Sequence, residues 1–406
     1  MSEIRADRVT VDTILSLTNS VLGKCKKRAP GSQGSLNAAD NLYEAMSGFC
    51  SNAKKETFDM HPGSLFAIGR VVGAVYVLSV ALLVLGNAFS YAAAVLCIVS
   101  LAYAVTHYFL YGRVFDVFFK KKTGCNVFGV LEPLDTVKRQ VIISGHHDGA
   151  YTFSFFSRFE KIAGIRLLLG VIFFTFITIV SMVFSIITAV GQDVRLESTL
   201  LIISLVGLLF AAPLFFFISR KVSPGAGDNL NGSSIAIHVV KHFAKTRRLK
   251  HTRLIALSTD GEEAGQRGAA NYAKRHRHEW VNIPTYVINI DSVYKKDELA
   301  VMLRDRHGIV PLSRELAGIC LETASELGYN AKKLTLPFGS GTDAAAFAKA
   351  KAKAVTVIAM STSLLDEGHV YHTLGDTLES IEPEAVEAVF NIAANTVIKI
   401  DSAREI

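Results

Sequence analysis

The stretch Ser258-Thr-Asp-Gly-Glu-Glu-Ala-Gly265 follows directly on a short apolar run, Leu254 to Leu257. Apolar runs of this length are typical of buried strands, so Glu262 and Glu263 are predicted just beyond the carboxyl end of a strand, where open α/β sheets build their sites. Two neighbouring buried carboxylates repel each other and need a counter-charge to stay ionised. A metal ion would provide that charge. Taken alone, the stretch favours a solvated Glu pair at the start of a helix, which the helix dipole also stabilises.

If a metal is bound, one of the two carboxylates is expected to be a ligand, and the other would take a proton from metal-activated water. A second candidate ligand is His146 in the run Ser144-Gly-His-His-Asp148. Alternation along a strand places His146 and Asp148 on the same side. A histidine ligand usually donates its second ring nitrogen to an acceptor, so Asp148 is predicted to orient His146.

Three further ligand candidates lie at or after the ends of predicted elements. Asp228 lies in the Gly-rich loop Pro224 to Gly232, which opens a helix, and it could be either an N-cap or a carboxylate that bridges two metals. Asp291 ends the run Tyr286 to Ile290, and His372 follows a later strand. Mixed imidazole and carboxylate ligands without cysteine favour zinc, and the oxygen-rich set fits a site with two metals.

From residue 220 onward, strand-like and helical stretches alternate. Such alternation predicts an α/β fold with a sheet covered by helices on both faces. The predicted strands are 126–131, 140–144, 253–257, 285–290, 299–303, 332–336 and 354–360, and an earlier one could cover 55–60.

Four long apolar stretches lie before residue 220, each close to the roughly 20 residues that a helix needs to cross a bilayer. They are 65–85, 89–108, 167–190 and 199–219. We therefore predict four transmembrane helices in two hairpins and one catalytic domain made of three soluble segments. The predicted boundaries are 1–63, 113–163 and 220–406 for the catalytic segments, and 64–112 and 164–219 for the hairpins.

Charges next to these stretches predict the orientation of the chain in the lipid bilayer. The flanks that face the soluble segments carry twelve basic residues, whereas the two short turns carry only Arg195. Basic residues favour the cytoplasmic side, so both termini and the catalytic domain are expected in the cytoplasm. The odd number of cysteines, five, without a CxxC motif, fits a reducing compartment. The net charge of +7 comes without a nucleic-acid-binding signature, so no nucleic-acid partner is expected.

These motifs together resemble metallopeptidase family 28, the di-zinc aminopeptidases whose fold is shared by glutamate carboxypeptidase II and transferrin receptor. The resemblance begins at Arg28 to Ser35, which is similar to an early Arg-x-x-Gly-Ser segment of the family. Five motifs then follow in the family's order: GHHDG at 145–149, GAGDN at 225–229, DGEEAG at 260–265, NIDS at 289–292 and YHTLGDT at 371–377.

The resemblance implies a role for each matching residue. One zinc would be held by His146 and Asp291, the other by Glu263 and His372, and Asp228 would bridge them. Glu262 would be the general base, Asp148 would orient His146, and Tyr371 would stabilise the tetrahedral intermediate. Asp343 matches a further family position.

The expected function is therefore that of a membrane-embedded zinc exopeptidase of the aminopeptidase type, which cleaves peptides with metal-activated water. Two alternatives remain open. One is a glutaminyl-cyclase-like acyltransferase with a single zinc. The other is a non-enzymatic membrane receptor or scaffold on the same fold. The membrane hairpins are a departure from the family pattern, because most relatives have a short connection between the residues that match Asp148 and Asp228.

Overall fold

The structure is a computed structural model that describes residues 3–50, 52–153, 160–192, 197–246, 249–335, 341–361 and 370–403. The chain folds into two compact units. The sheet unit comprises residues 1–62, 121–151 and 221–406, and the helical unit comprises residues 63–120 and 152–220. Residues 113–120, which the sequence places in a soluble segment, group with the helical unit.

The sheet unit is built around a mixed sheet in the order β1-β2-β6-β3-β7-β11-β8-β10, with β9 paired to β8. Its four central strands, β6, β3, β7 and β11, are parallel to one another, so their carboxyl ends meet at one edge. The strands are β1 Asn52–Met60, β2 Lys122–Leu131, β3 Arg139–His146, β6 Thr252–Thr259, β7 Thr285–Val293, β8 Leu299–Asp305, β9 Val310–Pro311, β10 Lys332–Thr335 and β11 Lys353–Ala359.

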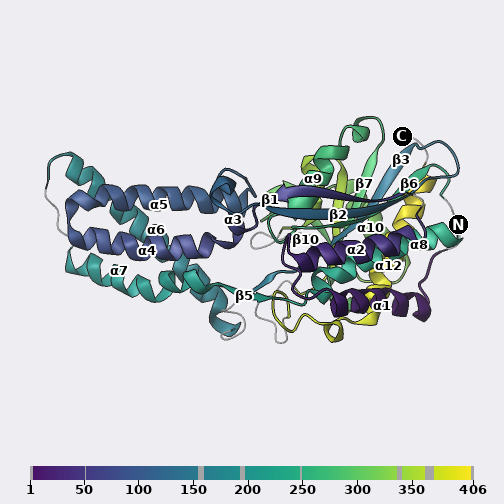
Figure 1. Cartoon of the computed structure of the whole chain (residues 1–406), viewed down its shortest axis with the longest axis horizontal. Helices are drawn as coiled ribbons and strands as arrows, with labels where there is room; N and C mark the ends of the chain where they lie inside the picture. The colour runs from purple at the N-terminus through teal and green to yellow at the C-terminus, as the bar shows by residue number, and fades with distance from the viewer. Residues whose placement is uncertain are drawn as a thin grey trace. The chain divides into compact units, whose positions relative to one another are not determined.

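Helices cover both faces of this sheet (Figure 1). Because side chains alternate along a strand, Val141 and Ile143 of β3 enter one apolar core while Ile142 enters the other. The first core is shared with α1 Arg8–Lys24, α2 Gln33–Ser47, α8 Asn231–Thr246, α10 Arg314–Glu326 and α12 Pro383–Ser402. The second is shared with α9 Arg267–His276 and α11 Asp343–Lys349. The predicted three-layer α/β fold is confirmed.

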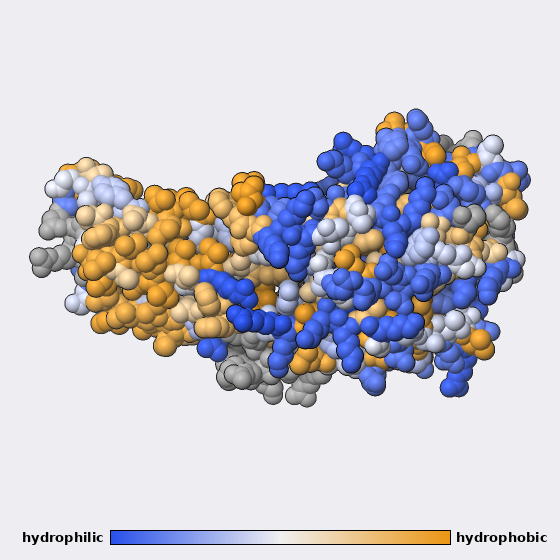
Figure 2. Space-filling model, in the orientation of Figure 1, coloured by the Kyte–Doolittle hydropathy of each residue, from blue (hydrophilic) through white to orange (hydrophobic). Residues whose placement is uncertain are grey.

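The helical unit contains four helices that are long and apolar enough to cross a membrane: Gly63–Leu85, Ser90–Phe109, Ile165–Ala189 and Ser198–Phe216. They agree with the four predicted spans to within a few residues. The elements that compose the unit are α3 Gly63–Phe66, α4 Ile68–Leu85, α5 Ser90–Ala104 with the π-helical turn Val105–Phe109, α6 Glu160–Ala189, α7 Ser198–Ala211 with the 3-10 turn Ala212–Phe216, and the small sheet of β4 Tyr151–Phe153 and β5 Ile218–Val222. Figure 2 shows that the visible face of these helices is almost entirely apolar.

Close contacts between small residues and large ones fix how these helices pack. A Cβ atom on Gly73 would lie 2.8 Å from the backbone nitrogen of Phe215, and one on Gly207 would lie 1.9 Å from the hydroxyl of Tyr76. That hydroxyl donates to the carbonyl of Ser204 at 2.9 Å. The unit therefore has its own core, in which glycines let the helices approach closely.

Candidate metal centre

The eight predicted site residues lie at strand ends and in loops at one edge of the sheet. His146 is the last residue of β3, Glu262 and Glu263 follow β6, and Asp291 lies near the end of β7. Asp228 lies in a π-helical turn, Ala226–Leu230, directly before α8, and the Asp228–Asn229 peptide bond is cis. Parallel pairing of β3 with both β6 and β7 brings the ends of these strands together.

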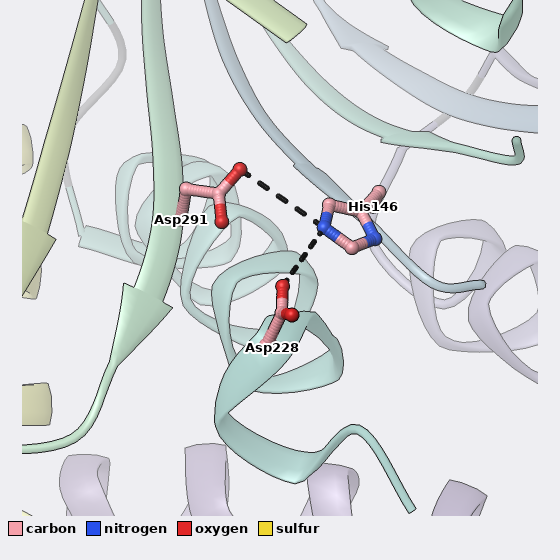
Figure 3. A group of neighbouring side chains, drawn as sticks. All are labelled: His146, Asp228 and Asp291. Atoms are coloured by element: carbon pink, nitrogen blue, oxygen red, sulfur yellow. Dashed lines mark ion pairs between the residues drawn. The ribbon is translucent and has the colours of Figure 1, made fainter. Parts of the chain in front are cut away.

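His146, Asp228 and Asp291 form the first group of possible metal ligands (Figure 3). The Nε2 atom of His146 lies 3.3 Å from Oδ1 of Asp228 and 4.0 Å from Oδ2 of Asp291. All three side chains are buried. The structure thus brings together three residues of which each is more than sixty positions from the next in the sequence.

Asp228, Glu263 and His372 form the second group. Here the Nε2 atom of His372 lies 3.2 Å from Oδ2 of Asp228 and 3.3 Å from Oε2 of Glu263. Asp228 therefore turns one carboxylate oxygen to each imidazole. This is the arrangement that a carboxylate bridging two metals requires.

The spacing of these atoms fits zinc. Tetrahedral ligands about 2.1 Å from an ion lie about 3.4 Å from one another, and the four separations above range from 3.2 to 4.0 Å. Among the described residues, Nε2 of His146, Oδ2 of Asp228 and Oε1 of Glu263 are buried without a hydrogen-bond partner. Buried polar atoms are rarely left in this state unless an ion or water binds them.

The pKa values of the buried groups also indicate that the site binds a positive ion. Burial raises the pKa of Asp291 to about 8, with a further rise from the Asp228 carboxylate and an opposing effect of His146. Burial lowers the pKa of His372, but the Glu263 and Asp228 carboxylates outweigh it and raise that pKa to about 10. Neighbouring carboxylates contribute to both rises in pKa, and a dication would neutralise this buried negative charge.

Asp148 has a larger part in the site than its sequence position suggested. Its Oδ1 lies 3.4 Å from Nδ1 of His146, and its backbone carbonyl oxygen lies 3.2 Å from the same nitrogen. In addition, its two carboxylate oxygens accept the backbone N–H groups of Glu262 at 3.2 Å and Glu263 at 3.1 Å. One buried carboxylate thus orients the histidine and also positions the backbone that carries both glutamates.

Arg28 is a component of the site that the spacing of the ligands did not reveal. It is 1% exposed, and it donates from Nε to the carbonyl of His147 and from a terminal nitrogen to the carbonyl of Gly225, both at 2.8 Å. Asp376 supports the same loop by accepting the backbone N–H groups of Gly227 at 2.8 Å and Asp228 at 3.3 Å. The only hint in the sequence is the Arg-x-x-Gly-Ser segment, since charged residues in Pro-Gly loops are usually solvated.

Two other predicted positions lie next to the ligands. The ring of Tyr371 stacks on that of His372, with centroids 3.9 Å apart. Asp343 is fully buried and accepts a hydrogen bond from the hydroxyl of Thr259. Residues 336–340 and 362–369, which precede Asp343 and Tyr371 in the chain, lie outside the described residues.

The family model described as "Peptidase family M28" matches residues 217–397, which include six of the eight predicted site residues. Residues 217–397 therefore belong to peptidase family M28, as the sequence resemblance implied. No curated protein matches the chain in sequence.

Solved structures share the fold of this chain. The zinc aminopeptidase BSAP from Bacillus subtilis is 12% identical, with a TM-score of 0.58 over 97% of this chain and 96% of its own. An aminopeptidase from Aneurinibacillus sp. strain AM-1 is 14% identical, with a TM-score of 0.55 over 97% and 94%. The glutaminyl cyclase of Fimbriiglobus ruber is 12% identical, with a TM-score of 0.56 over 97% of both chains. The M28 fold is therefore common to two kinds of enzyme.

Proposed function

We propose that this chain is a membrane-embedded zinc exopeptidase of the aminopeptidase type, with two zinc ions per chain. The observation that carries the proposal is the position of Asp228, whose two oxygens face His146 and His372 separately. A site for a single ion would need only one of these oxygens.

His146 and Asp291 would hold one zinc, Glu263 and His372 the other, and Asp228 would bind both. Zinc, when bound, supplies a Lewis acid that polarises a peptide carbonyl and makes water acidic enough to attack it near neutral pH. Two ions between three-residue groups leave positions open for water and substrate.

Glu262 is the assigned general base. Its Oε2 lies 4.0 Å from Nε2 of His146, and its backbone N–H is held by Asp148. Burial, together with the neighbouring Glu263 carboxylate, raises the pKa of Glu262 well above its usual range, against the effect of His146. A carboxylate with a raised pKa can accept the proton of the attacking water and pass it to the leaving amine. Tyr371, next to His372, would stabilise the oxyanion.

We further propose that the four apolar helices span a bilayer, with the sheet unit and both termini in the cytoplasm. Within the helical unit, the hydroxyl of Tyr103 near the end of the second span donates to the carbonyl of Ser64 at the start of the first. This end carries Arg70, near the start of the first span, and Arg113 and Lys120, which follow the second span, whereas the two turns between the spans carry only Arg195. This asymmetry favours a cytoplasmic location for the basic end.

The activity is tested with purified full-length protein. Elemental analysis should find two zinc ions per chain, and a peptide library should lose residues from free amino termini but not from acetylated ones. Removing zinc with a chelator should abolish cleavage, and adding zinc back should restore it. Cleavage that is indifferent to the chelator would refute the proposal.

A glutaminyl-cyclase-like acyltransferase is the second candidate, because the glutaminyl cyclase of Fimbriiglobus ruber matches the fold as well as the aminopeptidases do. Peptides with an amino-terminal glutamine separate the two candidates. An acyltransferase would cyclise them with release of ammonia and would contain one zinc. An aminopeptidase would release the glutamine as a free amino acid.

The orientation is tested with single introduced cysteines, because all five natural cysteines are buried. Val281 of the sheet unit is 83% exposed, and Gln192 lies in the exposed second turn. In intact cells, an impermeant thiol reagent should label Gln192→Cys, while Val281→Cys should react only after lysis. The reverse pattern would refute the orientation.

A further inference from the structure

The segment Leu110–Lys120, which we call the juxtamembrane turn, follows directly on the second apolar span. It is folded back on that span by hydrogen bonds. The backbone N–H of Gly112 donates to the carbonyl of Thr106 at 2.7 Å, and that of Phe115 donates to Nε2 of His107 at 3.1 Å. The turn therefore has a defined conformation within the helical unit.

Aromatic packing holds one side of the juxtamembrane turn against the helices. The ring of Phe115 packs edge-on against Tyr103 with centroids 5.1 Å apart, and the ring of Phe119 stacks on Tyr103 at 6.1 Å. Asp116, between them, is buried. The inward side is thus occupied by Phe115, Asp116 and Phe119.

The opposite side of the turn is apolar and exposed. Val114 is 70% exposed, Val117 79% and Phe118 78%. Val117 and Phe118 are adjacent in the 3-10 turn Asp116–Phe118, and Val114 lies three positions before Val117. The ring of Phe118 lies 6.4 Å from that of Phe115, centroid to centroid, but most of it remains exposed. The three exposed apolar side chains therefore lie within five consecutive residues of one short turn. Within the four described spans, the most exposed large apolar side chains, Leu85 and Phe216, reach only 67%. Three such residues side by side on a rigid turn indicate a surface that is covered in the working protein.

Two exposed basic residues of the helical unit flank this surface in sequence. Arg113 precedes Val114, and Lys120 follows two positions after Phe118. Apolar side chains bordered by Arg and Lys are the combination that binds in the interface of an anionic bilayer, where the apolar groups enter the acyl region and the cations meet the head groups. A symmetric pairing of two copies through this surface would instead bring Arg113 and Lys120 close to their own counterparts.

We propose that the juxtamembrane turn is an interfacial foot that inserts Val114, Val117 and Phe118 into one leaflet and selects anionic phospholipids through Arg113 and Lys120. The inference rests on the proposed membrane insertion and adds a lipid preference to it. It requires no change in the conformation of the turn, because its inward side is already packed.

Tryptophan fluorescence tests this directly, since the chain has a single tryptophan, Trp280. In a Trp280→Phe background, Phe118→Trp reports on the foot and Ile179→Trp, at a 56% exposed position of the third span, reports on the bilayer interior. Both variants are placed in nanodiscs that contain brominated phosphatidylglycerol or brominated phosphatidylcholine at the same mole fraction. Bromine quenches only tryptophans that contact the labelled lipid.

The tryptophan at position 118 should emit at shorter wavelength than an indole in water, and phosphatidylglycerol should quench it at least about twofold more than phosphatidylcholine, since each basic residue near an anionic surface favours binding roughly fivefold. Arg113→Gln with Lys120→Gln should remove this preference. The matched pair Lys26→Gln with Lys27→Gln, in the sheet unit, should leave it intact.

Each contrary outcome has a distinct meaning. If lipid does not quench the tryptophan at 179, the proposal that the helices span the bilayer is refuted, and the proposed lipid contact of the juxtamembrane turn is refuted with it. If the tryptophan at 179 is quenched while that at 118 emits as in water, the foot alone is refuted. A shielded tryptophan at 118 that no lipid quenches would show that protein covers the surface, and an equal effect of both lipids would refute the preference for anionic head groups.

Discussion

In the third span of the helical unit, polar side chains bond to the helix that carries them, whereas the polar side chains at the edge of the sheet unit converge from separate loops. The hydroxyl of Thr178 donates to the carbonyl of Phe174 at 2.8 Å, and that of Ser181 donates to Ile177 at the same distance. In the sheet unit, by contrast, Nε2 of His146 has no hydrogen-bond partner among the described residues. These hydroxyls of the third span are satisfied within their own helix, whereas the metal centre has buried polar atoms that a bound ion would satisfy.

The comparison predicts that substitutions reduce activity most at the metal centre, where the interacting side chains come from separate segments of the chain. Glu262→Gln removes the proton acceptor while keeping the size of the side chain, and turnover should fall by roughly 10²- to 10⁴-fold. The zinc content should stay close to two per chain, because none of the five assigned ligands is changed. Steady-state kinetics and elemental analysis on the same sample measure both.

Glu263→Gln is the matched variant, one position along the chain. It removes an assigned ligand, so zinc content should fall together with activity. If Glu262→Gln lost its zinc while Glu263→Gln kept it, the two roles would have to be exchanged.

A smaller effect is expected from Arg28→Met, which removes the guanidinium donors to the carbonyls of His147 and Gly225. The loop that carries Asp228 would lose part of its support, and zinc affinity should fall roughly 10- to 100-fold, as is typical when a group that positions ligands is removed. Competition with a chelator of known affinity measures this without reference to activity. Arg28→Lys should recover part of the loss, and Arg5→Met, at a half-exposed position, should have no effect.

Features of this centre could be predicted where they depend on residues close together in the sequence, and could not be predicted where they depend on contacts between distant residues. The convergence of the candidate ligands could be predicted because each lies at or after the end of a periodic segment, and parallel strands end at a common edge. The four central strands were predicted for the same reason, since apolar runs such as 253–257 and 285–290 are local signals. In the structure β6 begins one residue earlier and ends two residues later than predicted, and β7 begins at the predicted residue and ends three residues later.

The roles of Arg28 and of the backbone contacts of Asp148 could not be predicted from spacing. Arg28 lies 119 positions before His147, and the N–H groups that Asp148 accepts lie 114 and 115 positions away. Such contacts depend on how loops approach one another after the sheet has formed. The pairing of β10 with β8, and the short strand β9, were missed for a similar reason, because a two-residue strand has no periodicity to detect.

In the helical unit, the largest effect should come from packing. Gly207→Ala places a methyl group 1.9 Å from the hydroxyl of Tyr76, which must move and weaken its hydrogen bond to Ser204. Overpacking of this kind costs about 1 to 3 kcal/mol, so the helical unit should unfold at lower temperature in detergent. Zinc content should not change, because the sheet unit has its own cores. Gly23→Ala is the control, since a methyl group there would meet no atom within 4 Å.

The sharpest form of the comparison pairs two hydroxyl groups that each donate to a backbone carbonyl. Thr178→Val removes the bond to Phe174 within one helix, where that carbonyl keeps its helical partner, so the loss should be less than about 1 kcal/mol. Ser233→Ala removes the donor to the carbonyl of His146, which comes from a different element 87 positions away, and leaves buried groups unsatisfied at about 1 to 3 kcal/mol. Thermal unfolding of both variants in the same detergent, together with zinc affinity, measures the difference. Ser233→Ala also removes the contact of the Ser233 hydroxyl with that of Ser258 at 2.7 Å, whereas Thr178→Val leaves the helical hydrogen bond to Phe174 in place. An equal loss of stability in the two variants would contradict the comparison and show that buried polar groups have the same importance in both units.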